Sequence, residues 1–228
     1  MKLIDSLQSV FNKKACSCQC ASDAWCIHES EGSAKFKTLT VRKKDAEFGI
    51  IDNAFYKHSI GAIAKNSSSF LKDKDCDGVS FIEEGETCQW FFVDLKSSLN
   101  DNEISEGFQQ GFFSFMKMHM MSSLCDGYDV RSVNKIVFLV ACQPCKSLDE
   151  ESDIKQALQM SEELGELRHI DKCLGAYFYG SKEYVCTLGD IPLVGGKKLH
   201  KDILSINVSF MIFTPPNPND DSGVLELD

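Results

Sequence analysis

The sequence predicts an α/β protein in which a central mixed sheet is flanked by helices. Two strands separated by a turn are expected at 79–83 and 88–95, where apolar residues dominate. A helix is expected at 103–123, because its apolar residues recur at steps of three and four. The uninterrupted apolar run 135–141 predicts a further strand that is covered on both faces. This order of elements is typical of a mixed sheet.

The other segments carry weaker patterns. Each is assigned from hydrophobic alternation, helical spacing or turn residues. We expect, in chain order, a short helix at 1–14, an aperiodic stretch at 15–34, a strand at 35–43, a mixed helical or irregular stretch at 44–72, a charged helix at 148–172, a hairpin formed by 174–179 and 183–188, and a strand at 203–213.

The chain of 228 residues is long enough to bury a substantial core. We expect one main domain at 35–213, preceded by a Cys-rich segment at 1–34. The tail 214–228 contains three prolines and several acids, and is expected to be disordered. No run of about 18 apolar residues is present, and the N-terminus lacks the apolar run of a secretory signal. These features predict a cytoplasmic protein without a membrane span.

The charge balance argues against a free-standing basic DNA reader. The net charge is −10, and only three of the basic residues are arginine. Proteins that read DNA sequence usually present a basic face with arginine side chains. If this protein acts on nucleic acid, a local groove or a partner must supply the positive field.

Residues 73–98 contain the candidate catalytic residues. Gly85-Glu86 suits a two-residue type II′ turn, which places Glu84 opposite Thr87 and makes the numbers of all paired residues sum to 171. In this register Asp77 lies opposite Asp94, with Cβ atoms about 4.5–5.5 Å apart. Because strand side chains alternate, Lys96 shares a face with Asp94 and Leu95 points away.

This arrangement is typical of a metal-dependent hydrolase. Two close carboxylates repel each other unless a cation lies between them, and hard cations such as Mg²⁺ prefer oxygen ligands. A lysine beside them can orient or activate a water, or stabilise charge that develops at phosphorus.

The segment resembles the PD-(D/E)XK phosphodiesterase superfamily, which has the restriction-endonuclease-like fold. Asp77 matches the first acid of its motif, and Asp94-Leu95-Lys96 matches the second part, at the end of an apolar strand. The resemblance covers about residues 45–145. It implies a nuclease that hydrolyses DNA, with RNA as another possible substrate. It further implies that Asp77, Asp94 and the Leu95 carbonyl bind Mg²⁺ or Mn²⁺, and that Lys96 positions the attacking water.

The resemblance also bears on residues outside this motif. The family helix often carries a glutamine, for which Gln109 and Gln110 are the candidates, to orient Lys96 or a phosphate. It often has an acid on a preceding helix, for which Glu31 and Glu47 are weak candidates. Such nucleases often work beside an ATPase, helicase or sensor subunit, as in prokaryotic restriction and anti-phage defence. The alternative is a non-catalytic subunit that keeps the fold to bind a partner.

The same residues allow a calcium-binding interpretation. The positions Asp73, Asp75, Asp77, Gly78 and Glu84 satisfy the pattern of an EF-hand loop. Ser80 stands where the paired loop has an apolar residue, and a β-rich stretch follows in place of the exit helix. A single-loop calcium-binding protein is therefore a weaker alternative.

The eleven cysteines indicate a reducing compartment with mostly free thiols, because their count is odd and the chain is long. A zinc ion is an alternative for some of them, since 142–145 is a C-x-x-C knuckle. It requires the N-terminus to pack beside the end of the strand at 135–141. The candidate zinc ligands are Cys16, Cys18, Cys20, Cys26, Cys142 and Cys145.

Overall fold

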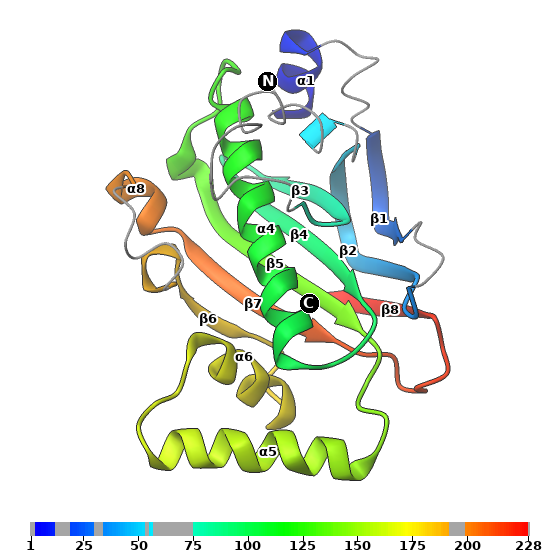
Figure 1. Ribbon diagram of the computed structural model, residues 1–228. Helices are drawn as coiled ribbons and strands as arrows, with labels where there is room; N and C mark the ends of the chain where they lie inside the picture. The colour runs from blue at the N-terminus through cyan, green and yellow to red at the C-terminus, as the bar shows by residue number, and fades with distance from the viewer. Residues whose placement is uncertain are drawn as a thin grey trace, which may run out of the picture.

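The computed structural model describes residues 3–11, 19–29, 34–52, 55–56, 75–191 and 199–227. They form an eight-stranded mixed sheet with helices against it, as the α/β prediction requires (Figure 1). The strand order is β1-β2-β3-β4-β5-β7-β6, and β8 also pairs with β2. No helix in these ranges is both long and apolar enough to cross a membrane.

The bounds of the elements follow the chain. The helices are α1 (Leu3–Val10), α4 (Asp101–Ser122), α5 (Leu148–Glu163), α6 (His169–Phe178) and α8 (Lys201–Leu204). The strands are β1 (Gln19–His28), β2 (Thr38–Ile51), β3 (Gly78–Glu84), β4 (Thr87–Lys96), β5 (Val133–Cys142), β6 (Tyr184–Thr187), β7 (Asn207–Phe213) and β8 (Ser222–Leu227). Short 3₁₀ turns precede β5 and follow β6.

The hairpin of β3 and β4 has the predicted register. Glu84 pairs with Thr87 and Gly78 pairs with Val93, so the numbers of paired residues sum to 171. Gly85 has φ +64°, whereas Glu86 has no positive φ, as a type II′ turn requires. The turn residues therefore fix which side chains face which side of the hairpin.

Helix α4 connects β4 to β5, which run parallel to each other. It lies across β4 and β5 on one face of the sheet (Figure 1). The contact is close at two glycines. A Cβ on Gly107 would lie 2.6 Å from a Val140 methyl, and one on Gly111 would lie 2.8 Å from the Phe138 ring. These distances are too short for a side chain, so only glycine at both positions allows α4 to pack this close to β5.

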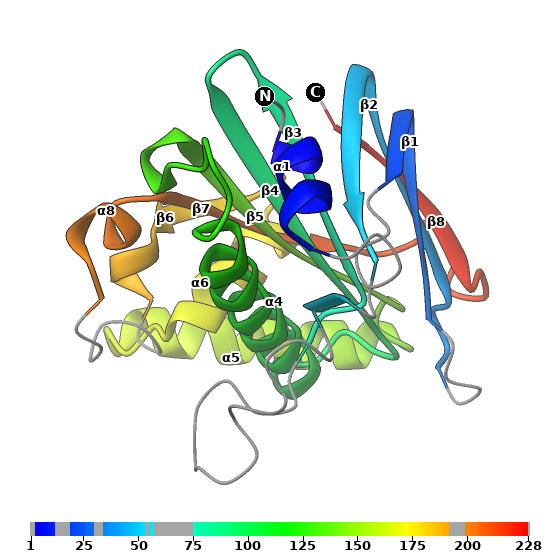
Figure 2. The same cartoon turned by 90° about the horizontal axis from the view of Figure 1, so that it is seen from above.

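The sheet has a core on each face. The larger core lies between the sheet and the helices, and includes Phe92, Phe115 and Phe138. The second core is enclosed because β1, β2 and β8 curl over the other face of β4 and β5 (Figure 2). The curl is located in β2, where Asp45 has φ +59° and faces an irregularity at Asp23 in β1 (φ +61°). Such bulges increase the bend of a strand.

Several expected elements are corrected. The stretch 15–34 is not aperiodic throughout, because β1 occupies 19–28. Two of its side chains, Trp25 and Ile27, are buried in the second core, and this alternation is too short to predict a strand. Residues 174–178 belong to α6 rather than to a hairpin, because α6 packs on β7. The strand expected at 203–213 begins only at Asn207, after α8.

The expectation of a disordered tail is also wrong for 222–227. This segment forms β8, which pairs in parallel with Thr38–Lys43 of β2. Leu225 and Leu227 pack against the second core, whereas Val224 is half-exposed. The alternating inward side chains of this segment stabilise it as a strand, and the prolines lie before it rather than within it.

We expect Leu225→Lys to destabilise the protein by about 2 kcal/mol, because it removes an apolar side chain from the second core. Val224→Lys is the matched control and is expected to change the unfolding free energy by less than about 0.5 kcal/mol, because that side chain faces solvent. Urea unfolding measures both. Equal midpoints for the two variants would contradict the placement of β8.

Candidate active site

The hairpin brings Asp77, Asp94 and Lys96 together on the face of the sheet that α4 covers. Asp77 directly precedes β3, and its N–H donates to the Val93 carbonyl at 2.9 Å. Its Oδ2 accepts the N–H of Leu95 at 2.8 Å. The carboxyl of Asp77 is thus fixed against the end of β4. Because the N–H and C=O of a strand residue point to the same side, the Leu95 carbonyl is directed toward this side as well.

Asp94 is almost fully buried, with 2% of its surface exposed. Its Oδ2 lies 2.9 Å from the Lys96 Nζ, yet accepts no hydrogen bond of good geometry. Helix α4 closes over this oxygen, because a Cβ on Gly107 would come within 3.0 Å of it. The ammonium of Lys96 therefore balances one buried carboxylate, whereas a second acid, Asp77, adds its negative charge beside it.

The electrostatics of Asp94 and Lys96 follow from this burial. Burial, and then the negative charge of Asp77, raise the pKa of Asp94 to about 8, although Lys96 opposes the rise. Burial works against the charge of Lys96, but the negative charges of Asp94, Glu106 and Asp77 together outweigh it and raise the pKa of Lys96. Lys96 is therefore an ammonium that donates hydrogen bonds. A cation bound at Asp94 would replace the proton that the raised pKa favours there.

Two residues of α4 complete the surroundings of Lys96. Its Nζ donates to Gln110 Oε1 at 2.7 Å and lies 3.9 Å from Glu106 Oε2. Sequence analysis missed Glu106. The two residues are four apart and share one side of the helix, so the choice of Gln110 would have pointed to Glu106.

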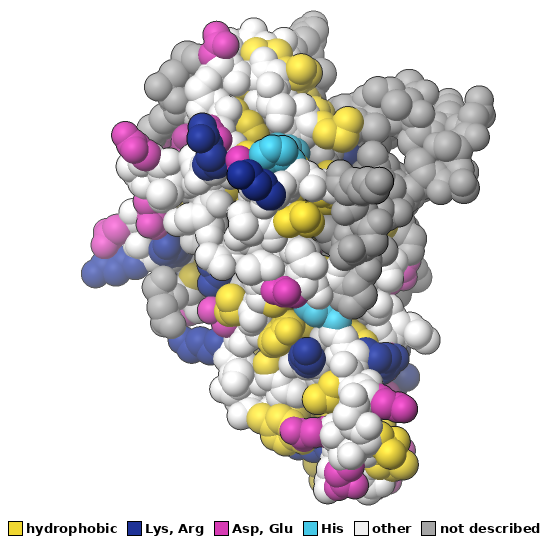
Figure 3. Space-filling view, turned by 90° about the vertical axis from the view of Figure 1, so that its left-hand side faces the viewer, with side chains coloured by type: hydrophobic (Ala, Val, Ile, Leu, Met, Phe, Trp, Pro, Cys, Tyr) yellow, Lys and Arg dark blue, Asp and Glu magenta, His cyan; other side chains and the backbone are white. Residues whose placement is uncertain are grey.

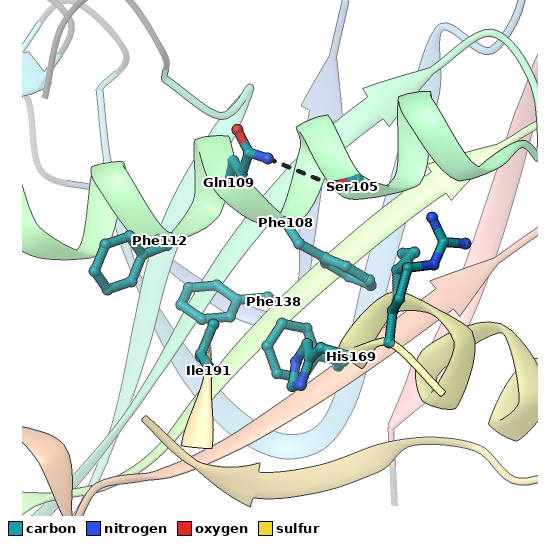
Figure 4. A pocket seen from close by; sticks show the side chains of 10 residues that line it. Ser105, Phe108, Gln109, Phe112, Phe138, His169 and Ile191 are labelled. Carbon is teal, nitrogen blue, oxygen red and sulfur yellow. Dashed lines mark hydrogen bonds between the residues drawn. The ribbon is translucent and has the colours of Figure 1, made fainter. Parts of the chain in front are cut away.

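Gln109 lies on another side of α4. Its amide is 3.5 Å from Ser105 Oγ, and both residues line a cavity of about 450 Å³ (Figure 4). The cavity has aromatic walls from Phe108, Phe112, Phe138 and Phe210, together with the His169 ring. Burial lowers the pKa of His169, which favours the neutral form of this ring. The structure therefore places Gln110, and not Gln109, beside Lys96.

The segment 75–77 is held in place by buried contacts that the sequence did not reveal. The Cys76 N–H donates to Ser114 Oγ at 3.0 Å, and the Tyr56 hydroxyl donates to the Cys76 carbonyl at 2.8 Å. Lys117 and Asp75 form a buried ion pair with an N–O distance of 2.5 Å. Ser114 and Lys117 lie on the same side of α4 as Gln110. This side of the helix therefore positions both the segment before β3 and the end of β4.

The calcium-loop interpretation does not agree with this geometry. Gly78 to Glu84 is a strand rather than a loop, so the two ends of the segment lie about 20 Å apart. Glu84 is exposed at the far end and pairs with Lys43. Asp75 pairs with Lys117 instead of facing Asp77 as a ligand. Asp73 lies outside the described residues.

The described cysteines do not gather around a metal. Cys26 contacts His28 and Thr40, at 3.4 and 3.7 Å. Cys142 is buried at the end of β5, which β2, β3 and β4 separate from β1 in the strand order, and burial raises the pKa of its thiol. Cys16 and Cys18 and the side chain of Cys20 lie outside the described residues, so the zinc hypothesis is untested there. Cys145 is half-buried in the loop after β5.

The third acid expected from a preceding helix is not found at its two candidates. Glu47 is exposed on β2, and Glu31 lies outside the described residues. Within the described ranges, no group of three or more His, Cys, Asp or Glu is arranged to hold a metal ion. Asp77 and Asp94 nevertheless supply oxygen atoms, which suit Mg²⁺ or Mn²⁺ rather than a soft metal.

The chain matches no protein-family model, no curated protein and no solved structure. Its chemistry must therefore be inferred from the site. A buried carboxyl group with a raised pKa, a second carboxyl group and an ammonium group converge at the end of β4. Such a set can bind a divalent cation and an anionic substrate side by side.

The stability of the metal-free protein is expected to depend on Asp94. The pKa of Asp94 in the folded protein, about 8, lies above the value of about 3.9 in an unfolded chain. The stabilisation from this group is therefore fully present below pH 4 and is lost as the pH rises through 8. We expect Asp94→Asn to raise the unfolding free energy at pH 9 by roughly 2 kcal/mol.

Chemical unfolding in EDTA between pH 5 and pH 9 measures this effect. Asp153→Asn, at an exposed position of α5, is the control and should follow the wild type. Mg²⁺ should stabilise the wild type at pH 9 but not Asp94→Asn. Identical pH profiles for the wild type and Asp94→Asn would show that Asp94 is ionised normally in the folded protein.

We expect Lys117→Met to destabilise the protein by about 3 kcal/mol, because it leaves Asp75 buried without its cation. Adding Asp75→Asn should recover part of this loss. Lys155→Met, which removes a more exposed ion pair with Glu151 on α5, is the control and should cost less than about 1 kcal/mol. Equal losses in urea unfolding would mean that the Lys117–Asp75 pair is not buried.

Proposed function

We propose that this protein is a metal-dependent nuclease with a restriction-endonuclease-like fold, which hydrolyses phosphodiester bonds of DNA or RNA. The observation that carries the proposal is the buried Asp94 carboxyl, which lies beside a second acid, Asp77, and forms an ion pair with Lys96. A purely structural role explains poorly why a sheet should bury an acid there.

The topology supports the proposal. Strands β2, β3 and β4 are antiparallel neighbours, and α4 then leads to the parallel strand β5. The order of the last four elements is the one that the resemblance implies. The first acid precedes β3 and the second motif ends β4, in agreement with the pattern of that superfamily.

Each residue has a chemical role in this proposal. Asp77, Asp94 and the Leu95 carbonyl would hold Mg²⁺ or Mn²⁺, which would supply a Lewis acid and an activated water. Lys96, kept as an ammonium, donates hydrogen bonds to the water or to a phosphate oxygen and stabilises negative charge that develops there. Gln110 holds the Lys96 side chain in position through its Oε1.

The alternative is a non-catalytic subunit that uses the same fold to bind a partner. A binding surface gains nothing from a buried acid, because replacing buried charges by apolar groups of similar size is often neutral or stabilising. We therefore favour the enzyme. The net charge of −10 supports the further proposal that the protein works within a complex that supplies the positive field. We also propose a cytoplasmic location. The resemblance implies the kind of complex, such as an anti-phage defence complex, with an ATPase, helicase or sensor subunit beside the nuclease.

A cleavage assay tests the proposal. The purified chain would be incubated with duplex DNA, single-stranded DNA and RNA in Mg²⁺, Mn²⁺, Ca²⁺ or EDTA. We expect cutting in Mg²⁺ or Mn²⁺, and a loss of at least about 100-fold in Asp94→Ala and Lys96→Ala. Glu84→Ala is the matched control, since Glu84 is an exposed acid on the same hairpin, and it should leave the rate unchanged.

The outcomes separate the proposals. Cutting that persists in Asp94→Ala and Lys96→Ala would place the activity elsewhere, or in a contaminant. A protein that neither cuts nor binds Mg²⁺ or Mn²⁺, measured by calorimetry, would support the interaction subunit. Metal binding without cutting would indicate an enzyme that requires its partner, and the assay would then be repeated with co-purified subunits.

A further inference from the structure

A hollow lined by lysines begins directly beyond Lys96. Its volume is about 500 Å³, and four segments of the chain contribute to it. Ser97 and Ser98, which follow Lys96, line one side. The other lining residues that matter here are Lys35, Lys37, Gln143 and Lys146.

Within the described part of the chain, none of the three lysines of the hollow forms an ion pair through its ammonium group. No described carboxylate oxygen lies within 4.0 Å of the Nζ of Lys35, Lys37 or Lys146, and all three residues are exposed. The Glu150 carboxylate accepts the backbone N–H of Lys146 at 2.7 Å. Other lysines pair with acids, for example Lys43 with Glu84 and Lys135 with Glu183. The hollow therefore keeps a positive charge in a chain with a net charge of −10.

The wider surface offers no such concentration of charge on the side shown in Figure 3. There the side chains of Lys and Arg are interspersed with those of Asp and Glu. Asp221 also lines the hollow, so its lysines outnumber its acids by three to one. A local positive field of this kind attracts an anion even when the whole protein is acidic.

The hollow lies at the same edge of the sheet as the carboxylates. Lys96 is the last residue of β4 and pairs with Cys142, the last residue of β5, and Gln143 follows. The Gln143 amide donates to the Asp220 carbonyl at 2.6 Å, while its Oε1 is buried without a partner. Ligands of α/β sheets commonly bind beyond the carboxyl ends of parallel strands.

We propose that this hollow binds the backbone phosphates of the nucleic-acid strand that flank the scissile bond. The proposal rests on the proposed nuclease function, and adds a docking site for the substrate to it. The ammonium groups of Lys35, Lys37 and Lys146 neutralise phosphate charge, and the Ser97 hydroxyl is available to donate to a phosphate oxygen. Because these contacts reach only the backbone, the hollow holds the strand without selecting a base sequence.

The salt dependence of binding tests this proposal. The Lys35→Ala/Lys37→Ala/Lys146→Ala protein would be compared with the wild type by fluorescence anisotropy. The probes are a labelled single strand and the corresponding duplex, in EDTA so that no cutting occurs. Each lost phosphate contact should reduce the slope of log K against log[salt] by about 0.7 for a single strand or 0.9 for a duplex. We expect the total slope to fall by about 2 for the single strand and by almost 3 for the duplex, and the affinity to fall roughly 10-fold or more at 100 mM salt.

The matched control removes the same charge elsewhere. Lys44, Lys172 and Lys201 are exposed, have no carboxylate within 4.0 Å among the described residues, and lie on β2, α6 and α8. Their triple alanine variant should keep nearly the wild-type slope. Circular dichroism and urea unfolding of both triple variants would exclude a folding defect as the cause.

The failure of this proposal can be told apart from failure of the nuclease function. If Asp94→Ala abolishes cleavage but both triple variants bind alike, the hollow is not the docking site and the nuclease function stands. If the wild type neither binds nor cuts any nucleic acid, both proposals fall. Loss of cleavage without a change in the salt slope would also overturn the docking site. Binding of an acidic protein, and of no nucleic acid, at the hollow would overturn it too.

Discussion

The burial of the Asp94 carboxyl beneath α4 is the constraint on which the rest of the site depends. The helix can lie that close to the strand only because residue 107 has no side chain. Once the carboxyl is cut off from water, its charge must be balanced locally. Lys96 provides that balance in part, and Gln110 fixes the direction from which it does so. A second acid, Asp77, adds a charge that the lysine alone does not neutralise.

The opposite face of the sheet makes this arrangement rigid. The residues of β4 that alternate with the site residues, Phe91, Val93 and Leu95, are buried in the second core. A shift of β4 by one residue would turn Asp94 and Lys96 toward the second core and the apolar side chains toward α4. The side chains on both faces would then lose their packing and charge partners. The curl of β1, β2 and β8 over that face therefore holds the side chains of the candidate site in register, although none of those three strands contributes to the site.

The sequence predicts those features that local rules determine. Gly85 fixes the turn, the turn fixes the register, and alternation then assigns Asp94, Lys96 and Leu95 to their faces. Contacts between distant segments are not accessible in the same way. The choice between Gln109 and Gln110 depends on the rotation of α4 about its axis, which the glycine contacts with β5 determine.

The same limit explains the two elements that sequence analysis missed. The strands β1 and β8 pair only with β2. The partner of β8 lies more than 180 residues away in the sequence, whereas β1 pairs with the next strand of the chain. Tertiary pairing overrides the weak local pattern in both segments.

The long sequence separation between β2 and β8 has a consequence for the order of folding. The contacts that build the carboxylate site, from Asp75 to Lys117, span at most 42 residues. Contacts that close longer loops form more slowly, so the site should assemble before β8 docks. Until then, Thr38–Lys43 of β2 presents a row of unpaired backbone groups on the side that β8 later occupies. The folding intermediate would thus have a nearly native site and an open sheet edge. Its main hazard is pairing with another chain at that edge.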